Sequence, residues 1–140
     1  KDGFISGYEN MDFDKVISIF ADSIKYYPSG VDAQMIEGID LMKENISFYM
    51  ANFENASFTE GSGLPGTDVA FWGGNTYPVA EAMSGPNNVR MYGSWNITNS
   101  NTGKSANFKQ YCVWSFNEDG KVHTVTEYLD LGGLLATFDE

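Results

Sequence analysis

The sequence predicts an α+β fold in which N-terminal helices pack on a strongly curved antiparallel or mixed sheet and enclose a cone-shaped pocket. Two observations predict it. Apolar residues recur at helical spacing in the first half of the chain, and they alternate with polar residues in the second half. The 140 residues contain neither an internal repeat nor a linker, so we expect a single domain over residues 1–140.

Two short helices are expected at the start of the chain. Phe4, Ile5 and Tyr8 share one face of the first helix. Asp12 is placed to cap the second helix, whose buried stripe is expected to hold four apolar residues, Phe13, Val16, Ile17 and Phe20. Residues 23–27, rich in Ile and Tyr, predict a short strand that ends at Pro28.

A third helix is predicted by the clearest pattern in the chain. Apolar residues recur there at steps of three and four positions, namely Ile39, Met42, Ile46, Tyr49, Met50 and Phe53. Gly38 and Asp40 stand at its start, and residues 52–55 are expected to close it.

From Ala56 onward the apolar period becomes two, which predicts strands. Phe58 opens a strand, residues 61–67 form a glycine-rich loop, and Val69 and Phe71 belong to the next strand. Residues 76–88 contain two prolines and predict an irregular excursion or a short helix. Three longer strands then follow at 89–98, 107–116 and 121–129, joined by turns at 99–104 and 117–120. Asp130 is expected to cap a final helical turn.

A strongly bent sheet wrapped around one long helix leaves a conical pocket. Three Trp, eight Tyr and ten Phe residues are enough to line it. We therefore expect the partner to be a small apolar or aromatic molecule.

Charge and composition exclude several classes of function. The formal net charge of −11 repels phosphate backbones, so we expect no nucleic acid partner. No apolar run approaches about 20 residues, so no membrane insertion is expected. Cys112 is the only cysteine and there is no Cys/His cluster, so we predict no metal site and no cofactor. Because the chain begins at Lys1, a cytoplasmic location and export by an upstream signal both stay open.

Several segments resemble one known superfamily. They are the helix start Asp12-Phe-Asp, Ala21-Asp22 before a strand that ends at Pro28, and the tail "DGKV…EYLDLGGLL". These features resemble SnoaL-like domains of the nuclear transport factor 2-like superfamily, whose relatives include ketosteroid isomerases and limonene-epoxide hydrolases. The resemblance implies a cystatin-like α+β cone. It does not imply one reaction, because this fold carries isomerases, cyclases, hydrolases and non-catalytic binding proteins.

The resemblance to ketosteroid isomerases does not extend to their catalytic residues. Their general-base Asp, next to the proline, corresponds to Tyr27. Their two oxyanion donors correspond to Phe4 and Cys112, which donate no hydrogen bond or only a weak one. Steroid-isomerase chemistry is therefore not expected.

The resemblance to epoxide hydrolases leaves one acid in place. The Arg and Asp that those relatives carry two residues apart correspond to Gly93 and Trp95, but their remaining Asp corresponds to Glu127. Glu127 is thus our candidate catalytic residue, facing into the cone as a proton-transferring group for an isomerase, cyclase or hydrolase type of reaction. Strand alternation places His123, Val125 and Leu129 on the same face as Glu127 and places Val122 on the opposite face.

Two functional hypotheses stay open. The first is a cofactor-independent acid/base enzyme, and the second is a non-catalytic ligand-binding or dimerisation module. A second polar group converging on Glu127, such as Tyr8, Tyr27 or Tyr49, would favour the enzyme. In both cases the expected ligand-binding residues are Phe4, Tyr8, Tyr27, Tyr49, Phe53, Trp95, Cys112, Trp114 and Leu129. The resemblance also implies a homodimer formed through the outer face of the sheet.

Overall fold

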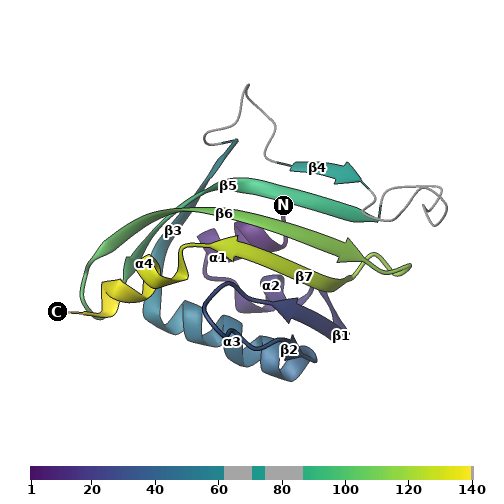
Figure 1. Ribbon diagram of the computed structural model, residues 1–140, viewed down its shortest axis with the longest axis horizontal. Coiled ribbons are helices and arrows are strands. Elements are labelled where there is room, and N and C mark those ends of the chain that lie inside the picture. Colours follow the sequence, from purple (N-terminus) through teal and green to yellow (C-terminus); the bar gives the residue numbers. More distant parts are fainter. Residues whose placement is uncertain (62–70, 75–86, 140) are drawn as a thin grey trace.

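The structure is a computed structural model that describes residues 1–61, 71–74 and 87–139. Helices α1, α2 and α3 lie on one side of a long curved sheet, and the C-terminal helix α4 lies beyond the end of β7 (Figure 1). The expected α+β architecture is confirmed. The predicted loop at 61–67, Val69 and the predicted excursion at 76–88 fall almost entirely outside the described residues.

The first two helices form where the sequence predicts them, but the second is shorter. α1 spans Phe4–Glu9 and α2 spans Phe13–Ile17. The Asp12 side chain accepts a hydrogen bond from the backbone N–H of Lys15 at 3.0 Å, which satisfies a free donor at the start of α2. Phe20 belongs to strand β1, Phe20–Tyr27, and not to the helix. It is buried in the core from that strand.

Helix α3 spans Ile39–Asn52 and buries Met42 and Ile46, one turn apart. The sequence pattern extends this helix to Phe53, and that extension is wrong. The backbone of Phe53 is extended (φ −132°, ψ 149°), and the residue begins strand β3, Phe53–Glu60. Phe53 is nevertheless buried against the same core, so its apolar character fits either assignment.

The described residues form one seven-stranded mixed sheet. Its other strands are β2 (Ile36–Glu37), β4 (Phe71–Gly74), β5 (Asn88–Asn99), β6 (Ser105–Phe116) and β7 (Val122–Leu129). The strand order is β2-β1-β7-β6-β5-β3, with β4 also paired to β5. β1 runs parallel to β7, whereas the other pairs are antiparallel. This parallel pair joins the beginning of the chain to its end.

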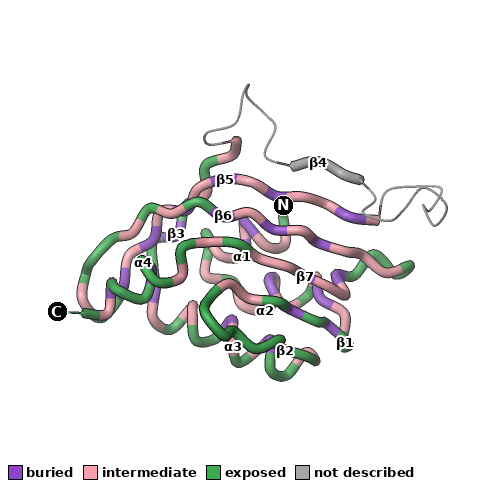
Figure 2. Tube along the Cα trace, viewed as in Figure 1, coloured by how far each residue is buried: buried purple, intermediate pink, exposed green. Residues whose placement is uncertain are grey.

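Burial alternates along the two longest strands, as Figure 2 shows for β5 and β6. The inward positions carry large apolar side chains, including Met91, Trp95, Ile97 and Trp114, and the helices pack against them. The outward positions are partly exposed. One face of the sheet therefore supplies the core and the walls of the cone.

A bulge in β7 changes the expected alternation. Ser115 pairs with Thr124, but the next residue, Phe116, pairs with Val122, so His123 is the extra residue on its strand. Val122 is 1% exposed and lies in the core, contrary to the prediction from simple alternation. Beyond the bulge, Val125 and Glu127 keep the inward positions that the sequence predicts.

A short helix follows the last strand and contributes to the cavity wall. Asp130 caps α4, Leu131–Leu135, by accepting the backbone N–H of Gly133 at 2.9 Å, as expected. A 3-10 turn, Ala136–Phe138, follows. Leu134 is buried and reaches the cavity described below.

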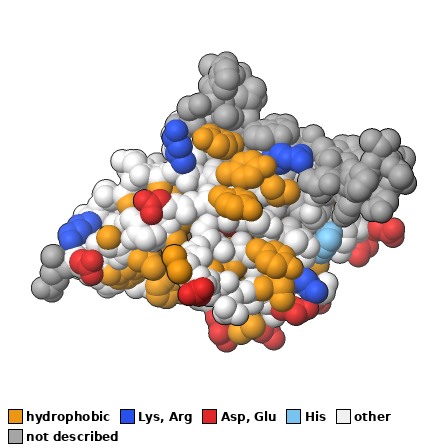
Figure 3. Space-filling model, viewed as in Figure 1, with side chains coloured by type: hydrophobic (Ala, Val, Ile, Leu, Met, Phe, Trp, Pro, Cys, Tyr) orange, Lys and Arg blue, Asp and Glu red, His pale blue; other side chains and the backbone are white. Residues whose placement is uncertain are grey.

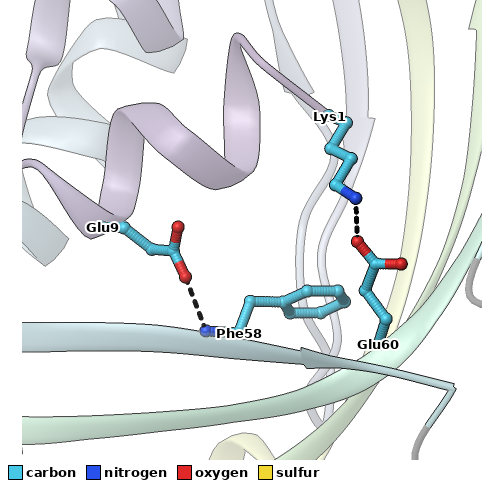
Figure 4. Close-up of polar contacts among 4 residues, drawn as sticks. All are labelled: Lys1, Glu9, Phe58 and Glu60. Carbon is cyan, nitrogen blue, oxygen red and sulfur yellow. Dashed lines mark hydrogen bonds and ion pairs between the residues drawn. The ribbon is translucent and has the colours of Figure 1, made fainter.

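Two polar contacts hold α1 against strand β3. The Glu9 carboxylate accepts a hydrogen bond from the backbone N–H of Phe58 at 3.0 Å, and the Lys1 ammonium pairs with Glu60 (Figure 4). Since β3 is the last strand of the sheet order, Glu9 satisfies a donor on its outer edge. Both ends of α1 are therefore fixed, which positions Phe4 and Tyr8 over the core.

Candidate active site

The candidate site is a cavity between the helices and the inner face of the sheet. The space open to the centres of water molecules is about 90 Å³. Since one water needs roughly 10–15 Å³, the cavity has room for several water molecules or a small organic molecule. Its wall is formed by Phe4, Tyr8, Met11, Tyr26, Met42, Asn45, Tyr49, Phe53, Ala56, Trp95, Ile97, Phe108, Gln110, Trp114, Val125, Glu127, Leu129 and Leu134.

Glu127 is the carboxylate of this wall. It lies near the end of β7, and its side chain is held by two donors from the neighbouring strands. The Tyr26 hydroxyl on β1 donates to Oε1 at 2.7 Å, and the Gln110 amide on β6 donates through Nε2 to Oε2 at 2.6 Å. One donor on each oxygen fixes the plane of the carboxylate and leaves each oxygen with further lone-pair capacity.

The orientation of the Gln110 amide is itself fixed. Its Oε1 accepts a hydrogen bond from the indole Nε1 of Trp95 on β5 at 2.8 Å. The indole nitrogen can only donate, so Gln110 must present its oxygen to Trp95 and its NH₂ group to Glu127. Trp95 and Gln110 are both 5% exposed, which shields this chain of hydrogen bonds from bulk water.

Ser29 fixes the backbone of Glu127. Parallel pairing between β1 and β7 reaches Tyr27 and Thr126. Just beyond it, the Ser29 hydroxyl donates to the backbone carbonyl of Glu127 and accepts from the backbone N–H of Leu129, both at 2.8 Å. The side chain of Ser29 thus replaces one step of the ladder where Pro28 interrupts β1.

The protein environment shifts the ionisation of the cavity groups. Burial raises the pKa of Glu127 above its usual value, although the hydrogen bonds from Tyr26 and Gln110 oppose the shift. Burial, then the charge of Glu127, raises the pKa of Tyr49 to about 12 and the pKa values of Tyr8 and Tyr26 further. The three phenols are therefore neutral donors near pH 7, while Glu127 can take up a proton more readily than an exposed glutamate.

Aromatic rings form most of the remaining wall. Phe4 makes edge-to-face contacts with Tyr8 and Trp114, with ring centroids 4.9 and 4.6 Å apart. Tyr8 in turn lies 6.1 Å from Trp95, again nearly perpendicular. These rings come from α1, β5 and β6, so the fixed position of α1 defines one side of the cavity.

The structure brings most of the predicted ligand-binding residues to this cavity. Seven of the nine predicted residues line it, namely Phe4, Tyr8, Tyr49, Phe53, Trp95, Trp114 and Leu129. Their role in binding a ligand stays a prediction. The other two, Tyr27 and Cys112, do not line it.

Tyr27 points away from the cavity because neighbouring strand residues face opposite sides of the sheet. It is 43% exposed, whereas Tyr26 is 4% exposed and takes the inward position. Cys112 does face inward, directly across from Glu127 in the β6–β7 register, but its small side chain is fully covered. Burial raises the pKa of the Cys112 thiol well above its ordinary value, so it stays protonated.

Gly93 and Trp95 occupy the positions that correspond to the Arg and Asp of epoxide hydrolases. A Cβ atom at Gly93 would overlap the ring of Phe58 and come within 2.7 Å of the Thr59 carbonyl. Phe58 therefore occupies the space that a side chain at residue 93 would need. At the second of these positions the polar group is the Trp95 indole N–H, which donates to Gln110 and makes no direct contact with Glu127.

Sequence reasoning missed Tyr26, Gln110 and Asn45. Tyr26 could have been found from strand parity, since Ile24 and Tyr26 are the inward residues of β1. Gln110 alternates with Cys112 and Trp114 on β6, and an inward glutamine on an apolar face is a detectable signal. Asn45 lies four residues before Tyr49 on α3, one helical turn away, and both line the cavity.

Within the described part of the chain, no cluster of three or more His, Cys, Asp or Glu residues is arranged to hold a metal ion. No helix among the described residues is long and apolar enough to cross a membrane.

Comparison of the structure with solved proteins identifies its fold. No protein-family model matches the sequence, and no curated protein sequence matches it significantly. An NTF2-like protein of unknown function from Burkholderia pseudomallei superposes with a TM-score of 0.70, at 17% identity over 99% of this chain and 93% of that one.

Two further structures agree with this result. A protein from Shewanella denitrificans described as SnoaL-like gives a TM-score of 0.65, at 12% identity over 97% of this chain and 91% of that one. A protein with a ketosteroid isomerase-like fold from Catenulispora acidiphila, in complex with trimethylamine, gives 0.66, at 10% identity over 96% and 88%. The expected resemblance is thus confirmed at the level of fold: this chain adopts the cone-shaped α+β fold of the nuclear transport factor 2-like superfamily, shared with SnoaL-like and ketosteroid isomerase-like proteins.

Proposed function

We propose that this protein is a cofactor-independent acid/base enzyme that binds a small apolar or aromatic molecule in the cavity and exchanges a proton with it through Glu127. One observation carries the proposal: a buried carboxylate with a raised pKa is held by two oriented donors on the wall of an aromatic cavity. A carboxylate whose pKa is raised towards neutrality is a better general base or acid near pH 7.

The polar groups around Glu127 favour an enzyme over a simple binding module. The hydroxyls of Tyr8 and Tyr49 belong to the same wall, and the charge of Glu127 raises the pKa of both phenols. Neither hydroxyl makes a hydrogen bond with a described residue, so both can donate to a ligand. Donors of this kind are able to stabilise negative charge that develops when Glu127 removes a proton.

The test uses proton exchange, which needs no knowledge of the natural substrate. A panel of small aromatic and alicyclic ketones is incubated with the protein in D₂O, and NMR measures deuterium uptake next to the carbonyl. The wild-type protein is expected to accelerate the exchange of at least one ketone. Glu127→Gln should lower that rate by about 100-fold or more, since a positioned base contributes roughly 10²–10⁴-fold.

Glu118→Gln is the matched control, because it removes one exposed carboxylate from the hairpin turn and should leave the exchange rate unchanged. Ketones that bind in the cavity but exchange at the same rate with wild type and Glu127→Gln would contradict the enzyme and support the non-catalytic binding module.

We also propose that the chain forms a homodimer through the outer face of its sheet. Three tyrosines, Tyr92, Tyr111 and Tyr128, cross β5, β6 and β7 in a row, with ring centroids 6.3 and 6.1 Å apart. Tyr128 is 60% exposed. Hydrophobic side chains gather over the central strands on this face (Figure 3). A second copy would cover this apolar surface, and sedimentation tests the assembly.

A further inference from the structure

The described wall of the cavity contains an acidic side chain and no basic one. Glu127 is the acid of that wall, and no Lys, Arg or His among the described residues lines it. Ion pairs among the described residues lie elsewhere on the molecule, at Lys1–Glu60, Lys25–Glu37 and Lys43–Asp40. The cavity therefore contains an acid without a basic counterpart, in a chain whose net charge is −11.

A buried carboxylate is ordinarily compensated by a cation or a metal, because hydrogen bonds from neutral donors offset only part of the cost of removing it from water. Here the compensation from the protein is two neutral donors, Tyr26 and Gln110. The remaining lone-pair capacity of the carboxylate is available to a bound molecule, since Glu127 lines the cavity.

The groups that face Glu127 from the surrounding elements add no second charge. They are Tyr8 on α1, Tyr26 on β1, Tyr49 on α3, and Gln110 and Cys112 on β6. Each titratable member of this set has a pKa raised by burial and is neutral near pH 7. Any net charge in the cavity is therefore the negative charge of Glu127.

The aromatic wall also favours positive charge. The faces of Phe, Tyr and Trp rings carry partial negative charge and attract cations at distances up to about 6 Å. Phe4, Tyr8, Trp95 and Trp114 contribute rings from different elements, several of them nearly perpendicular to one another. All four residues line the cavity, so their rings can bury the apolar groups of a small ligand.

We infer that the cavity selects an organic ammonium ion: a small amine whose positive nitrogen pairs with Glu127 and whose apolar body packs against the aromatic wall. The inference rests on the proposed function, because both require a small ligand beside Glu127, and it adds the charge of that ligand. The positive nitrogen supplies the counter-charge that the wall lacks. An anionic ligand would place two like charges in a poorly solvated space.

Three probes that share one ring but differ in charge test this inference at pH 7. Benzylammonium is positive, benzyl alcohol is neutral and close to it in shape, and benzoate is negative. Isothermal titration of the wild-type protein should give a Kd for benzylammonium at least tenfold lower than for benzyl alcohol, with no measurable binding of benzoate. Equal affinities for benzylammonium and benzyl alcohol would overturn the inference, as would binding of benzoate or of none of the three.

Two variants separate pairing with Glu127 from the attraction of a cation to an acidic protein. In Glu127→Gln the preference for benzylammonium should disappear, leaving the two Kd values within about twofold. Glu118→Gln removes the same formal charge from an exposed position and should keep the tenfold preference. A preference that persists in Glu127→Gln, or that is lost equally in both variants, would overturn the inference.

The test of the ammonium ligand and the test of the proposed enzyme activity can fail independently of each other. The preference for a cation is measured as affinity, whereas the acid/base proposal is measured as deuterium exchange on neutral ketones. Exchange that depends on Glu127 together with equal binding of the ammonium and the alcohol would retain the enzyme and reject the cationic ligand. The reverse pattern would retain an ammonium-binding pocket and reject catalysis.

Discussion

Tyr26 and Glu127 are 101 residues apart in the chain, and their side chains meet at 2.7 Å across the parallel pair of strands β1 and β7. The contact joins a phenol on the first strand of the chain to a carboxylate on the last strand. Since Tyr26 donates to the ionised form of Glu127, it favours that form and opposes the effect of burial on the carboxyl pKa.

Replacement of Tyr26 by Phe removes this donor and keeps the ring that fills the core. The pKa of Glu127 is expected to rise further, since a contact that lowers it is lost. Loss of a hydrogen bond to a charged group should also lower the free energy of unfolding by about 1–3 kcal/mol where Glu127 is ionised. NMR titration of the Glu127 carboxyl carbon measures the pKa. Tyr27→Phe is the neighbouring control, because Tyr27 is partly exposed and lies outside the cavity; an equal shift in both variants would contradict the role of Tyr26.

The raised pKa of Glu127 predicts how stability depends on pH. Below the ordinary pKa of 4.5 the group is protonated in both the folded and unfolded states. Between 4.5 and the folded-state pKa it is ionised only when unfolded, so this residue lowers the stability of the fold as pH rises through that interval. Each pH unit of the interval costs about 1.4 kcal/mol. Glu127→Gln should therefore gain stability relative to wild type as pH rises in urea-unfolding series, and a constant difference between the two proteins would refute the shift.

The chain from Trp95 through Gln110 to Glu127 predicts energetic coupling between Trp95 and Gln110. Gln110→Leu leaves the buried indole N–H without its acceptor, which should cost about 1–3 kcal/mol. In a Trp95→Phe background that donor is already absent, so the further cost of Gln110→Leu should be smaller by about 0.5–3 kcal/mol. Urea unfolding of the four proteins gives the coupling. Additive effects would mean that Trp95 does not orient Gln110.

The tyrosine row on the outer face predicts the effect of a charge at its edge. Tyr128→Lys places an ammonium group where a second copy is proposed to pack, and burying that charge costs several kcal/mol. Sedimentation velocity at micromolar concentration should show the wild type as a dimer and this variant as a monomer. Glu118→Lys places the same ammonium group in the exposed hairpin turn, with a larger change in net charge (+2 instead of +1), and should still be dimeric. A variant Tyr128→Lys that sediments as the wild type does would contradict this interface.

The regular parts of the fold could be predicted from the sequence because they follow from periodicity and capping. The α3 stripe, the Asp12 and Asp130 caps and the strand alternation that puts Glu127 on one face with Val125 and Leu129 are local patterns, whereas the resemblance implied that this face looks into the cone. The error in predicting where helix α3 ends also has a physical cause. Phe53 is apolar and buried in either a helix or a strand, so hydrophobic spacing alone cannot locate the point where α3 becomes β3.

The site itself could be predicted only in part, for two reasons. Adjacent residues of a strand face opposite sides of the sheet, so Tyr26 faces the core whereas Tyr27 faces outward. Because His123 is an extra residue in a bulge, Val122 and Val125 both face the core although they are three positions apart. The bulge arises from pairing with β6, which no local pattern encodes. The partners of Glu127 come from two other strands, so they become visible only when the register of the sheet is known.

The parallel pairing of β1 with β7 has a consequence for the order of events during folding. Strand β7, which pairs with β1, is synthesised more than 90 residues after β1 ends. A nascent chain therefore carries Tyr26 long before Glu127 exists. Closing so long a loop is slow compared with forming a helix or a hairpin. The β5–β6 and β6–β7 hairpins can thus form first, and the carboxylate site is completed only when the two ends of the chain meet. Ligand affinity during refolding is therefore a probe of the final step, whereas helix content reports the early ones.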